Sequence, residues 1–473
     1  MKVINTNFNF LNNVFKEYDV RGIFPEEINN KFAYFFGRAI ADISNLKNIK
    51  NLVIGYDCRV SSFKIFNCLK SGISDGGINI LDIGNVPTPL VYYAIKFYNI
   101  NSGISITGSH NPKNYNGFKV IIDNNFLYGK DFKNIKKIML FHMINNRKKI
   151  NGITNKITIM NSYISRINRD INLCKKIKII IDSGNGITGF IAPKVLKKIG
   201  CKVTEIFSKI DGNFPNHHPD PSNKKNLNDI IFYLKKSDNE LGVSLDGDGD
   251  RSIIITKYGN IIYPDRQLII FSKDILSINN NKNKVIIYDI KCSKNVENAI
   301  KYFGGKSLIY ITGHSYLKNK ISKINAILAG EMSGHIFFND RWFGFDDGIY
   351  TASRMIEILS RHTFPSYYLS SLPHSFSIPE IKIYMNRKES LNLIKKIKDK
   401  WNFQKFKKII TIDGIRIGYP YGFCLIKISN TMPFIILRFE GNSKKTLIYI
   451  KNNLLKQLIK FNEKFKYFKH MSN

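Results

Sequence analysis

The sequence predicts an α/β protein made of three related α/β units and a C-terminal α+β unit. Two observations carry this prediction. An apolar run, a polar loop, a helix-period segment and a second apolar run occur in this order three times, starting near residues 51, 177 and 284. Beyond about residue 372 the order changes to a helix, four short strand-like runs and a closing helix. A chain of 473 residues is also too long for one hydrophobic core.

The three repeated units share a βαβ pattern. They span residues 51–84, 176–207 and 283–311, and glycine stands where the helix of the later two should stop, at Gly200 and at Gly304-Gly305. In α/β domains with parallel strands, ligands bind at the loops beyond the strand ends. Each unit is therefore expected to present a loop that carries chemistry.

The composition is that of a packed globular protein with a large basic excess. The hydrophobic fraction is 43%, and 72 basic residues against 36 acidic ones give a net charge of +36. The lysines are spread evenly among asparagines and isoleucines, and no nucleic-acid-binding motif accompanies them. We expect no nucleic-acid partner.

The cysteines and the apolar runs bear on location. The six cysteines are scattered without a C-x-x-C pair, which is typical of reduced thiols in the cytosol. The first residues, MKVINTNFNFLNN, lack the apolar core of a signal peptide, and no apolar run is long enough to span a bilayer. The sequence predicts a cytoplasmic protein without a membrane segment.

The first unusual loop is SITGSHNPKNYNGFKV, in which an apolar run is broken around Ser109. Gly108 permits backbone angles closed to other residues, and Pro112 blocks continued backbone pairing. The serine hydroxyl is thus expected on a tight loop. A nucleophile elbow is excluded, since Thr107 and Asn111 stand where G-x-S-x-G needs glycine. The alternative is a polar turn between strands.

The second loop, in GVSLDGDGDRSIII, places Asp246, Asp248 and Asp250 on alternate positions. Three carboxylates this close repel unless a cation neutralises them, and hard oxygen ligands favour Mg²⁺. An EF-hand is excluded because Arg251 and Lys257 occupy its glycine and glutamate positions. A solvated acidic turn remains the alternative.

The third loop lies in AGEMSGHIFFNDRWFGFDDGIY. Glu331, Ser333 and His335 are bracketed by glycines before an apolar run, an arrangement that suits sugar hydroxyls. Upstream, TGHS supplies His314 and Ser315 on another glycine turn. For each histidine a purely structural role is the alternative.

The fourth unit contains KISNTMPFIILRFEG, whose turn and flanks resemble a cradle for an anion. Hydroxyls, turn amides and cations come from Lys427, Ser429, Asn430, Thr431 and Arg438. In so lysine-rich a chain, an ordinary turn with basic neighbours is the alternative.

Together these loops indicate phosphoryl transfer on a sugar phosphate, a reaction that depends on positioning and charge neutralisation. Near the N-terminus, YDVRGI adds Tyr18 and Arg21, a weak signal by itself. No P-loop and no kinase signature is present, so no nucleotide source is indicated. Without one, Ser109 itself could carry the phosphoryl group.

Several motifs stand in one order along the chain: YDVRG, TGSHNP, GNFPNHHPDPS, DGDGDR, TGHS, GEMSGH with RWFGFDDGIY, and SNT with LRFEG. With them the chain resembles the α-D-phosphohexomutases, and among these the bacterial phosphomannomutase/phosphoglucomutase enzymes. The likeness covers essentially the whole chain.

The resemblance implies roles for individual residues. Ser109 would be phosphorylated and, with Asp246, Asp248 and Asp250, would bind Mg²⁺. Glu331 and Ser333 would bind the 3- and 4-hydroxyls of the sugar. The unreactive phosphate would be held by Lys427, Ser429, Asn430, Thr431 and Arg438. The remaining residues expected around the substrate and the reacting groups are Tyr18, Arg21, Lys119, Arg251, Lys291, His314 and His335, of which His335 or Lys119 would move the proton.

The resemblance also implies an architecture and a mechanism. Three α/β/α domains with mixed sheets (1–155, 156–260 and 261–371) and a domain resembling the TATA-binding protein (372–473) would surround a central cleft. Phospho-Ser109 would phosphorylate a hexose 1- or 6-phosphate, and the 1,6-bisphosphate would turn around and return its other phosphoryl group. Mg²⁺ and glucose 1,6-bisphosphate are the expected cofactor and activator, hexose phosphates the partners, and a monomer the expected state.

Two other functions are weighed against this one. Phosphoglucosamine mutases resemble this chain but typically have glutamine where Met332 stands and Gly-Thr-Glu where this chain has Asn-Thr-Met. A non-catalytic sugar-phosphate-binding protein would not need the serine and the three aspartates. One departure from the family is Lys427, where arginine is usual, and lysine offers a point charge instead of a bidentate fork.

Overall fold

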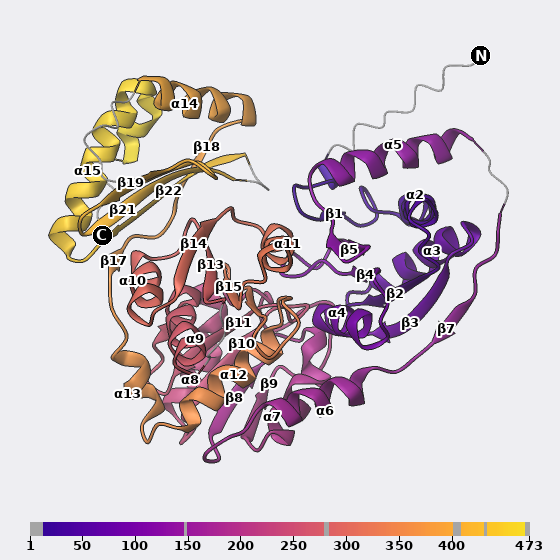
Figure 1. The fold of residues 1–473 in the computed structure, drawn as a ribbon, viewed down its shortest axis with the longest axis horizontal. Helices are drawn as coiled ribbons and strands as arrows, with labels where there is room; N and C mark the ends of the chain where they lie inside the picture. Colours follow the sequence, from indigo (N-terminus) through magenta and orange to yellow (C-terminus); the bar gives the residue numbers. More distant parts are fainter. Residues whose placement is uncertain (1–12, 146–148, 279–282, 401–407, 430–432, 469–473) are drawn as a thin grey trace.

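The computed structural model describes residues 13–145, 149–278, 283–400, 408–429 and 433–468. Figure 1 shows four sheet-containing domains in an arc, with the N-terminal domain at one end and the C-terminal domain at the other. In each of the three repeated units, the two strands that flank the helix pair in parallel. The predicted fold class, three α/β/α domains with mixed sheets and a fourth domain of another kind, is confirmed.

The first domain is built on a seven-stranded mixed sheet in the order β1-β5-β4-β2-β3-β7, with β6 on β5. Leu52 and Ile54 of β2 face one core layer, and Val53 between them faces another, as strand alternation requires. The strands are β1 (Val20–Ile23), β2 (Asn51–Tyr56), β3 (Asn79–Asn85), β4 (Gly103–Ile106), β5 (Tyr115–Ile122), β6 (Asn125–Phe126) and β7 (Thr154–Lys156). The helices are α2 (Asn30–Leu46), α3 (Ser62–Asp75), α4 (Thr88–Phe97) and α5 (Lys130–Ile144).

The second domain has a five-stranded sheet in the order β12-β11-β10-β8-β9. Its strands are β8 (Lys178–Asp182), β9 (Lys202–Ile206), β10 (Leu241–Leu245), β11 (Ser252–Thr256) and β12 (Ile261–Ile262), and its helices are α6 (Met160–Asp170), α7 (Ala192–Lys198) and α8 (Asn228–Lys235). Because β10 and β11 are antiparallel neighbours, residues 246–251 form the tip between them. The aspartate-rich loop therefore lies at one edge of this sheet.

The third domain has a four-stranded sheet in the order β14-β13-β15-β16. Its strands are β13 (Val285–Asp289), β14 (Lys306–Tyr310), β15 (Leu328–Gly330) and β16 (Ile336–Phe338), and its helices are α9 (Pro264–Ile278), α10 (Lys294–Tyr302), α11 (His314–Ile324), α12 (Gly348–Ser360) and α13 (Pro365–Ser370). The antiparallel pair β15 and β16 presents residues 331–335 at its tip.

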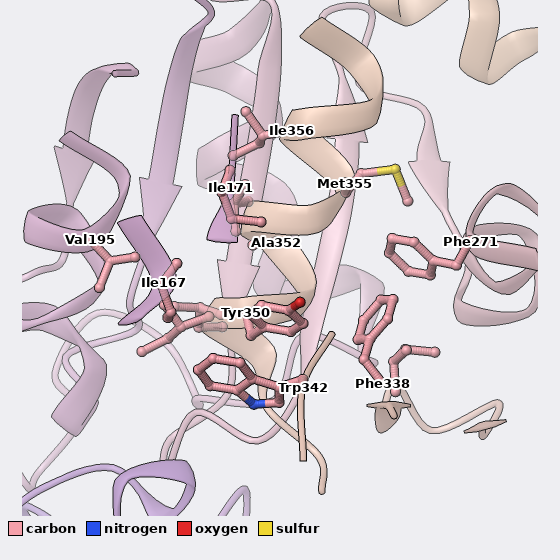
Figure 2. Packing of buried hydrophobic residues seen from close by; sticks show 14 of the residues in the cluster. Ile167, Ile171, Val195, Phe271, Phe338, Trp342, Tyr350, Ala352, Met355 and Ile356 are labelled. Carbon is pink, nitrogen blue, oxygen red and sulfur yellow. The ribbon is translucent and has the colours of Figure 1, made fainter. Parts of the chain in front are cut away.

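Helix α12 joins the second and third domains through one hydrophobic core. Figure 2 shows its Ala352, Met355 and Ile356 among side chains from α6, α7, α9 and β16. The ring of Trp342 stacks on that of Tyr350 at 4.2 Å between centroids. Burial of this shared apolar layer makes the two domains one packed body and fixes their loops relative to each other.

The fourth domain is an antiparallel sheet with helices packed on one face. Its strands are β17 (Phe376–Ser377), β18 (Ile381–Tyr384), β19 (Lys408–Ile410), β20 (Ile415–Tyr419), β21 (Gly422–Ile428) and β22 (Phe434–Gly441), and its helices are α14 (Arg387–Lys400) and α15 (Lys444–Phe461). The sequence predicts only the last four strands. β17 and β18 are short, and both are held by pairing with β22, which a local pattern does not reveal.

The strand pairing in the first two sheets suggests small shifts in the expected domain borders. β7 pairs with β3 of the first sheet, and β12 pairs with β11 of the second. We therefore propose borders after residues 156 and 262 in place of 155 and 260, and keep the border after 371. Within the described residues, none of the helices combines the length and the apolar character that crossing a membrane would require.

Candidate active site

Ser109 lies on the loop between β4 and β5, buried, in a left-handed backbone conformation with φ of 49°. The expectation that Gly108 supplies the unusual angles is wrong, because the serine itself adopts them. Gly108 is needed for space: a Cβ there would lie 2.5 Å from the guanidinium of Arg59. The Ser109 hydroxyl lies 3.1 Å from His110 Nδ1 and donates to Asp246 Oδ2 at 3.3 Å.

The three aspartates of the second domain meet this serine. Asp246, Asp248 and Asp250 are fully buried, and one carboxylate oxygen from each lies within 4.8 Å of the others. A Cβ on Gly247 would come 2.6 Å from the backbone oxygen of Ser109, so only glycine lets the two loops approach this closely. The serine and the carboxylates thus form one site across two domains.

Two cations face the three carboxylates. Lys119 of β5 donates to Asp248 at 2.6 Å and to Asp250, and Arg251 Nε donates to Asp246 at 2.9 Å. Burial raises the pKa of Asp246 to about 8 against the pull of Arg251. Burial also opposes ionisation of Asp250, but Lys119 and His335 outweigh it and hold its pKa well below the usual range.

The same carboxylates offer ligands for a divalent cation. Asp248 Oδ1 and Asp250 Oδ1 are buried and make no hydrogen bond among the described residues, and Asp250 Oδ1 has only the ion-pair contact with His335 at 3.5 Å. A buried oxygen without a partner costs free energy, and a hard cation would satisfy both oxygens. The donor set therefore fits Mg²⁺.

The loop between β15 and β16 places its polar residues at the same point. His335 Nε2 lies 3.5 Å from Asp250 Oδ1, and its Nδ1 lies 2.8 Å from the Ser333 hydroxyl and 3.3 Å from Glu331 Oε2. Burial opposes the positive charge of His335, but Asp250 and Glu331 raise its pKa to about 9. Glu331 also accepts a hydrogen bond from the backbone N–H of Gly313, which ties this loop to the start of α11.

His314 and Tyr18 continue this row of rings. His314 stacks on His335 at 5.3 Å between ring centroids, and the ring of Tyr18 lies edge-on to that of His314 at 5.4 Å. His314 is the first residue of α11, and Gly313 before it is the N-cap of the helix, with φ of 139°. Burial and nearby Lys318 hold the pKa of His314 well below its usual value.

The remaining expected cations have carboxylate partners. Arg21 of β1 bonds to Asp19 and to Asn111, so it lies beside the Ser109 loop. Lys291, just after β13, forms an ion pair of 2.8 Å with Glu380 of the fourth domain. It thus lies where the third and fourth domains meet.

Two of the residues predicted to bind phosphate in the fourth domain, Lys427 and Arg438, lie where this domain contacts the third domain. Lys427 of β21 donates to Asp413, whose other oxygen accepts the backbone N–H of Thr312 at 2.9 Å. Arg438 lies two pairs along the sheet, with its guanidinium 3.8 Å from Met332 Sδ and 3.9 Å from Asp265.

Ser429 follows β21 directly, and its backbone N–H donates to the carbonyl of Phe434. Asn430 and Thr431 lie outside the described residues. Three of the five residues expected at the phosphate loop are therefore described. Lys427 lies near the end of β21, Ser429 directly after it, and Arg438 within β22.

Models of three protein domains match successive parts of this chain. They are domain I (residues 12–141), domain II (161–259) and domain III (263–376) of phosphoglucomutase/phosphomannomutase, each described as an alpha/beta/alpha domain. The chain belongs to the phosphoglucomutase/phosphomannomutase family.

Curated and solved members of this family align with nearly the whole chain. A phosphoglucomutase of Neisseria gonorrhoeae is 42% identical over 93% of this chain and 95% of its own length. A phosphomannomutase/phosphoglucomutase of Pseudomonas aeruginosa is 39% identical over 94% and 95%. The crystal structure of a family protein from Burkholderia thailandensis superposes with a TM-score of 0.90 at 38% identity, over 98% of each chain. The resemblance drawn from the motifs is confirmed.

For this phosphoglucomutase/phosphomannomutase family member, sequence reasoning missed several polar residues of the site. Thr88, at the start of α4, donates to Asp248 at 2.6 Å, and Asp346 accepts from Lys318 at 2.8 Å beside His335. Asp57 and Arg59 form hydrogen bonds with the serine loop, to the Thr107 hydroxyl and to the Ser109 carbonyl respectively. Asp57 and Arg59 follow the end of β2, a position where ligands collect in α/β sheets, and this was the signal available in the sequence.

A cavity of about 700 Å³ lies at the border of the third and fourth domains. Its lining includes Asp265, Arg266, Met332, Arg438 and Glu440. Neither Ser109 nor the three aspartates lines it, so we do not place the reaction in this cavity.

Proposed function

We propose that the protein moves a phosphoryl group reversibly between O1 and O6 of hexose phosphates, with Ser109 as the carrier. The observation that carries this proposal is the contact between the Ser109 hydroxyl and the buried carboxylate cluster, 3.3 Å from Asp246. A polar turn with no chemical role would not need three buried carboxylates next to its hydroxyl. The family membership and the names of the relatives support the same reaction class.

Each step exchanges one O–P bond for another. The bond between Ser109 Oγ and phosphorus breaks while a bond forms from the free sugar hydroxyl to the same phosphorus. The proton of that hydroxyl ends on Ser109 Oγ, which leaves as a hydroxyl. His335 or Lys119, which both touch Asp250, moves it by giving its own proton to Ser109 Oγ as it takes up the proton of the sugar. The 1,6-bisphosphate then turns around, and its other phosphoryl group returns to Ser109 by the reverse exchange.

The residues divide the remaining tasks. Asp246, Asp248 and Asp250, with Ser109, would hold Mg²⁺. The ion would neutralise charge that develops on the transferring group. Lys119, Arg21 and Arg251 add positive charge around the phosphoryl oxygens.

The third and fourth domains bind the substrate in this proposal. Glu331 and Ser333 hold the 3- and 4-hydroxyls of the sugar, beside Tyr18, Lys291 and His314. The unreactive phosphate lies against Lys427, Ser429, Asn430, Thr431 and Arg438. The ion pairs of Lys291 with Glu380 and of Lys427 with Asp413 would then have to share their ammonium groups with substrate.

Glucose 1,6-bisphosphate is the proposed activator, because it can phosphorylate Ser109 in protein that has lost the group. One chain supplies all four loops, so the proposal takes the enzyme to be a monomer. All six cysteines are free thiols, which supports a cytoplasmic location.

The proposal predicts turnover of both glucose 1-phosphate and mannose 1-phosphate, with kcat/KM values within about two orders of magnitude. The two sugars differ only at carbon 2, and the intermediate brings its 2-hydroxyl to two different places as it turns. A site that accepts both orientations does not offer that hydroxyl one desolvated partner. Stronger discrimination usually requires such a partner.

The test measures both hexoses and glucosamine 1-phosphate under one buffer condition, with the bisphosphate and Mg²⁺ present. A preference beyond about a thousandfold for one hexose contradicts dual specificity. Dominant activity on glucosamine phosphate would transfer the assignment to phosphoglucosamine mutase. Binding of all three sugars without turnover would favour the non-catalytic alternative.

A further inference from the structure

Arg59 is a buried arginine whose guanidinium donates hydrogen bonds to the backbone of the serine loop. It lies just after β2, and its side chain is fully enclosed. Its Nη2 donates to the carbonyls of Ser109 and Asn111 at 2.7 Å each, and its Nη1 donates to those of Pro112 and Tyr115 at 2.6 and 3.0 Å. One side chain thus binds four carbonyls of a single turn.

Asp57 holds the other side of the same turn. Its Oδ2 accepts the hydroxyl of Thr107 at 2.8 Å and the N–H of Gly108 at 3.2 Å, and it lies 3.3 Å from Arg59 Nε. Thr107 in turn accepts the N–H of Ser109 at 2.7 Å. The ion pair therefore fixes residues on both sides of the serine, and each member neutralises the buried charge of the other.

The second domain completes this arrangement with its GNFPNHHPDPS loop, to which sequence analysis gave no role of its own. The ring of Phe214 lies 5.2 Å from the Arg59 guanidinium, and a Cβ on Gly212 would come within 2.4 Å of the Cys58 carbonyl. Lysine could not reproduce these contacts, since it lacks the planar fork that spans several acceptors while it stacks on a ring.

We propose that Arg59 and Asp57 are positioning residues for phosphoryl transfer, which force Ser109 into its left-handed conformation and aim its hydroxyl at the aspartate cluster. A non-glycine residue with positive φ persists only where its surroundings impose it, and these contacts do so. The inference deepens the proposed function and rests on it for the catalytic effect. A loose turn would leave the hydroxyl misplaced with respect to both the metal site and the sugar.

The test compares Arg59→Lys with Arg38→Lys in the full-length protein. Arg38 is a matched control, since it is also buried in the first domain and also donates to a backbone carbonyl, that of Asp75. We expect Arg59→Lys to lower kcat about 100-fold with little change in KM, while Arg38→Lys leaves both unchanged. Hydrogen exchange of the peptide covering residues 107–116 should rise at least tenfold only in Arg59→Lys.

Asp57→Asn serves as the second variant, because it keeps the shape of the side chain if Arg59→Lys does not fold. We expect it to increase exchange in the same peptide and to lower kcat. Unchanged exchange in a folded variant would overturn the positioning role, and so would faster exchange with normal kcat. A kcat loss matched by Arg38→Lys would show a general loss of stability and also overturn it. If the parent enzyme has no mutase activity, the proposed function fails, whereas the exchange measurement still decides whether Arg59 shapes the turn.

Discussion

Replacing Ser109 by alanine is expected to lower kcat/KM by more than about 10³-fold, a loss of roughly 4 kcal/mol of transition-state stabilisation. The hydroxyl is the only group that the proposed mechanism offers as a phosphoryl carrier, and alanine has no oxygen to form the bond. Stability should change little, because the hydroxyl makes only long contacts of 3.1 and 3.3 Å. The assay measures conversion of glucose 1-phosphate with saturating bisphosphate and Mg²⁺.

Ser44→Ala provides the matched control for this substitution. Ser44 is a fully buried serine of α2 in the same domain, and its hydroxyl has no hydrogen-bond partner in the described part of the chain. We expect normal kcat/KM in this variant and thermal midpoints of both variants within a few degrees of the parent. Turnover of Ser109→Ala within tenfold of the parent would disprove the covalent mechanism.

Removing the divalent cation is expected to abolish turnover, and Mg²⁺ should restore it. Without the ion, the charge that develops on the transferring phosphoryl group would lose its neutralising cation, and the carboxylates of the aspartate loop would face the phosphate directly. Asp248→Asn should raise the Mg²⁺ concentration for half-maximal activity by at least about tenfold, since a neutral amide is a weaker ligand than a carboxylate. The measurement is an Mg²⁺ titration of activity after treatment with a chelator.

Asp274→Asn is the control for loss of a buried carboxylate. Asp274 pairs with Arg361 and Arg354, and it belongs to α9 outside the aspartate loop. Its substitution should leave the Mg²⁺ requirement unchanged. Full activity of the parent enzyme in excess chelator, or an equal Mg²⁺ shift in both variants, would count against the assigned metal site.

The features that could be predicted from the sequence are those determined by residues close together in the chain. The βαβ order gave three parallel strand pairs, and the alternating aspartates gave the tip between β10 and β11. Ser109 stood out because a polar turn interrupts an apolar run. Such signals survive folding because strand, turn and glycine preferences act over a few neighbouring residues.

The features that sequence reasoning missed depend on residues far apart in the chain. The sequence suggests that glycine is needed at position 108 for its backbone freedom. In the structure it is needed because the guanidinium of Arg59, which follows β2, leaves no room for a side chain there. Lys427 is predicted as a phosphate ligand, but the sequence does not reveal that Asp413 accepts a hydrogen bond from it. β17 and β18 exist because β22 pairs with them. Tertiary contacts of this kind leave no periodic trace in the sequence.

The most direct test of the central claim is to ask whether Ser109 carries a phosphoryl group that the substrate can take. The purified protein is incubated with glucose 1,6-bisphosphate and Mg²⁺, freed of small molecules, and analysed by intact mass and peptide mapping before and after excess glucose 1-phosphate. We predict that the protein carries one phosphoryl group, located on Ser109. Excess glucose 1-phosphate should remove this group and be converted to glucose 1,6-bisphosphate. A protein that turns over hexose phosphate while Ser109 never carries phosphate would contradict the account.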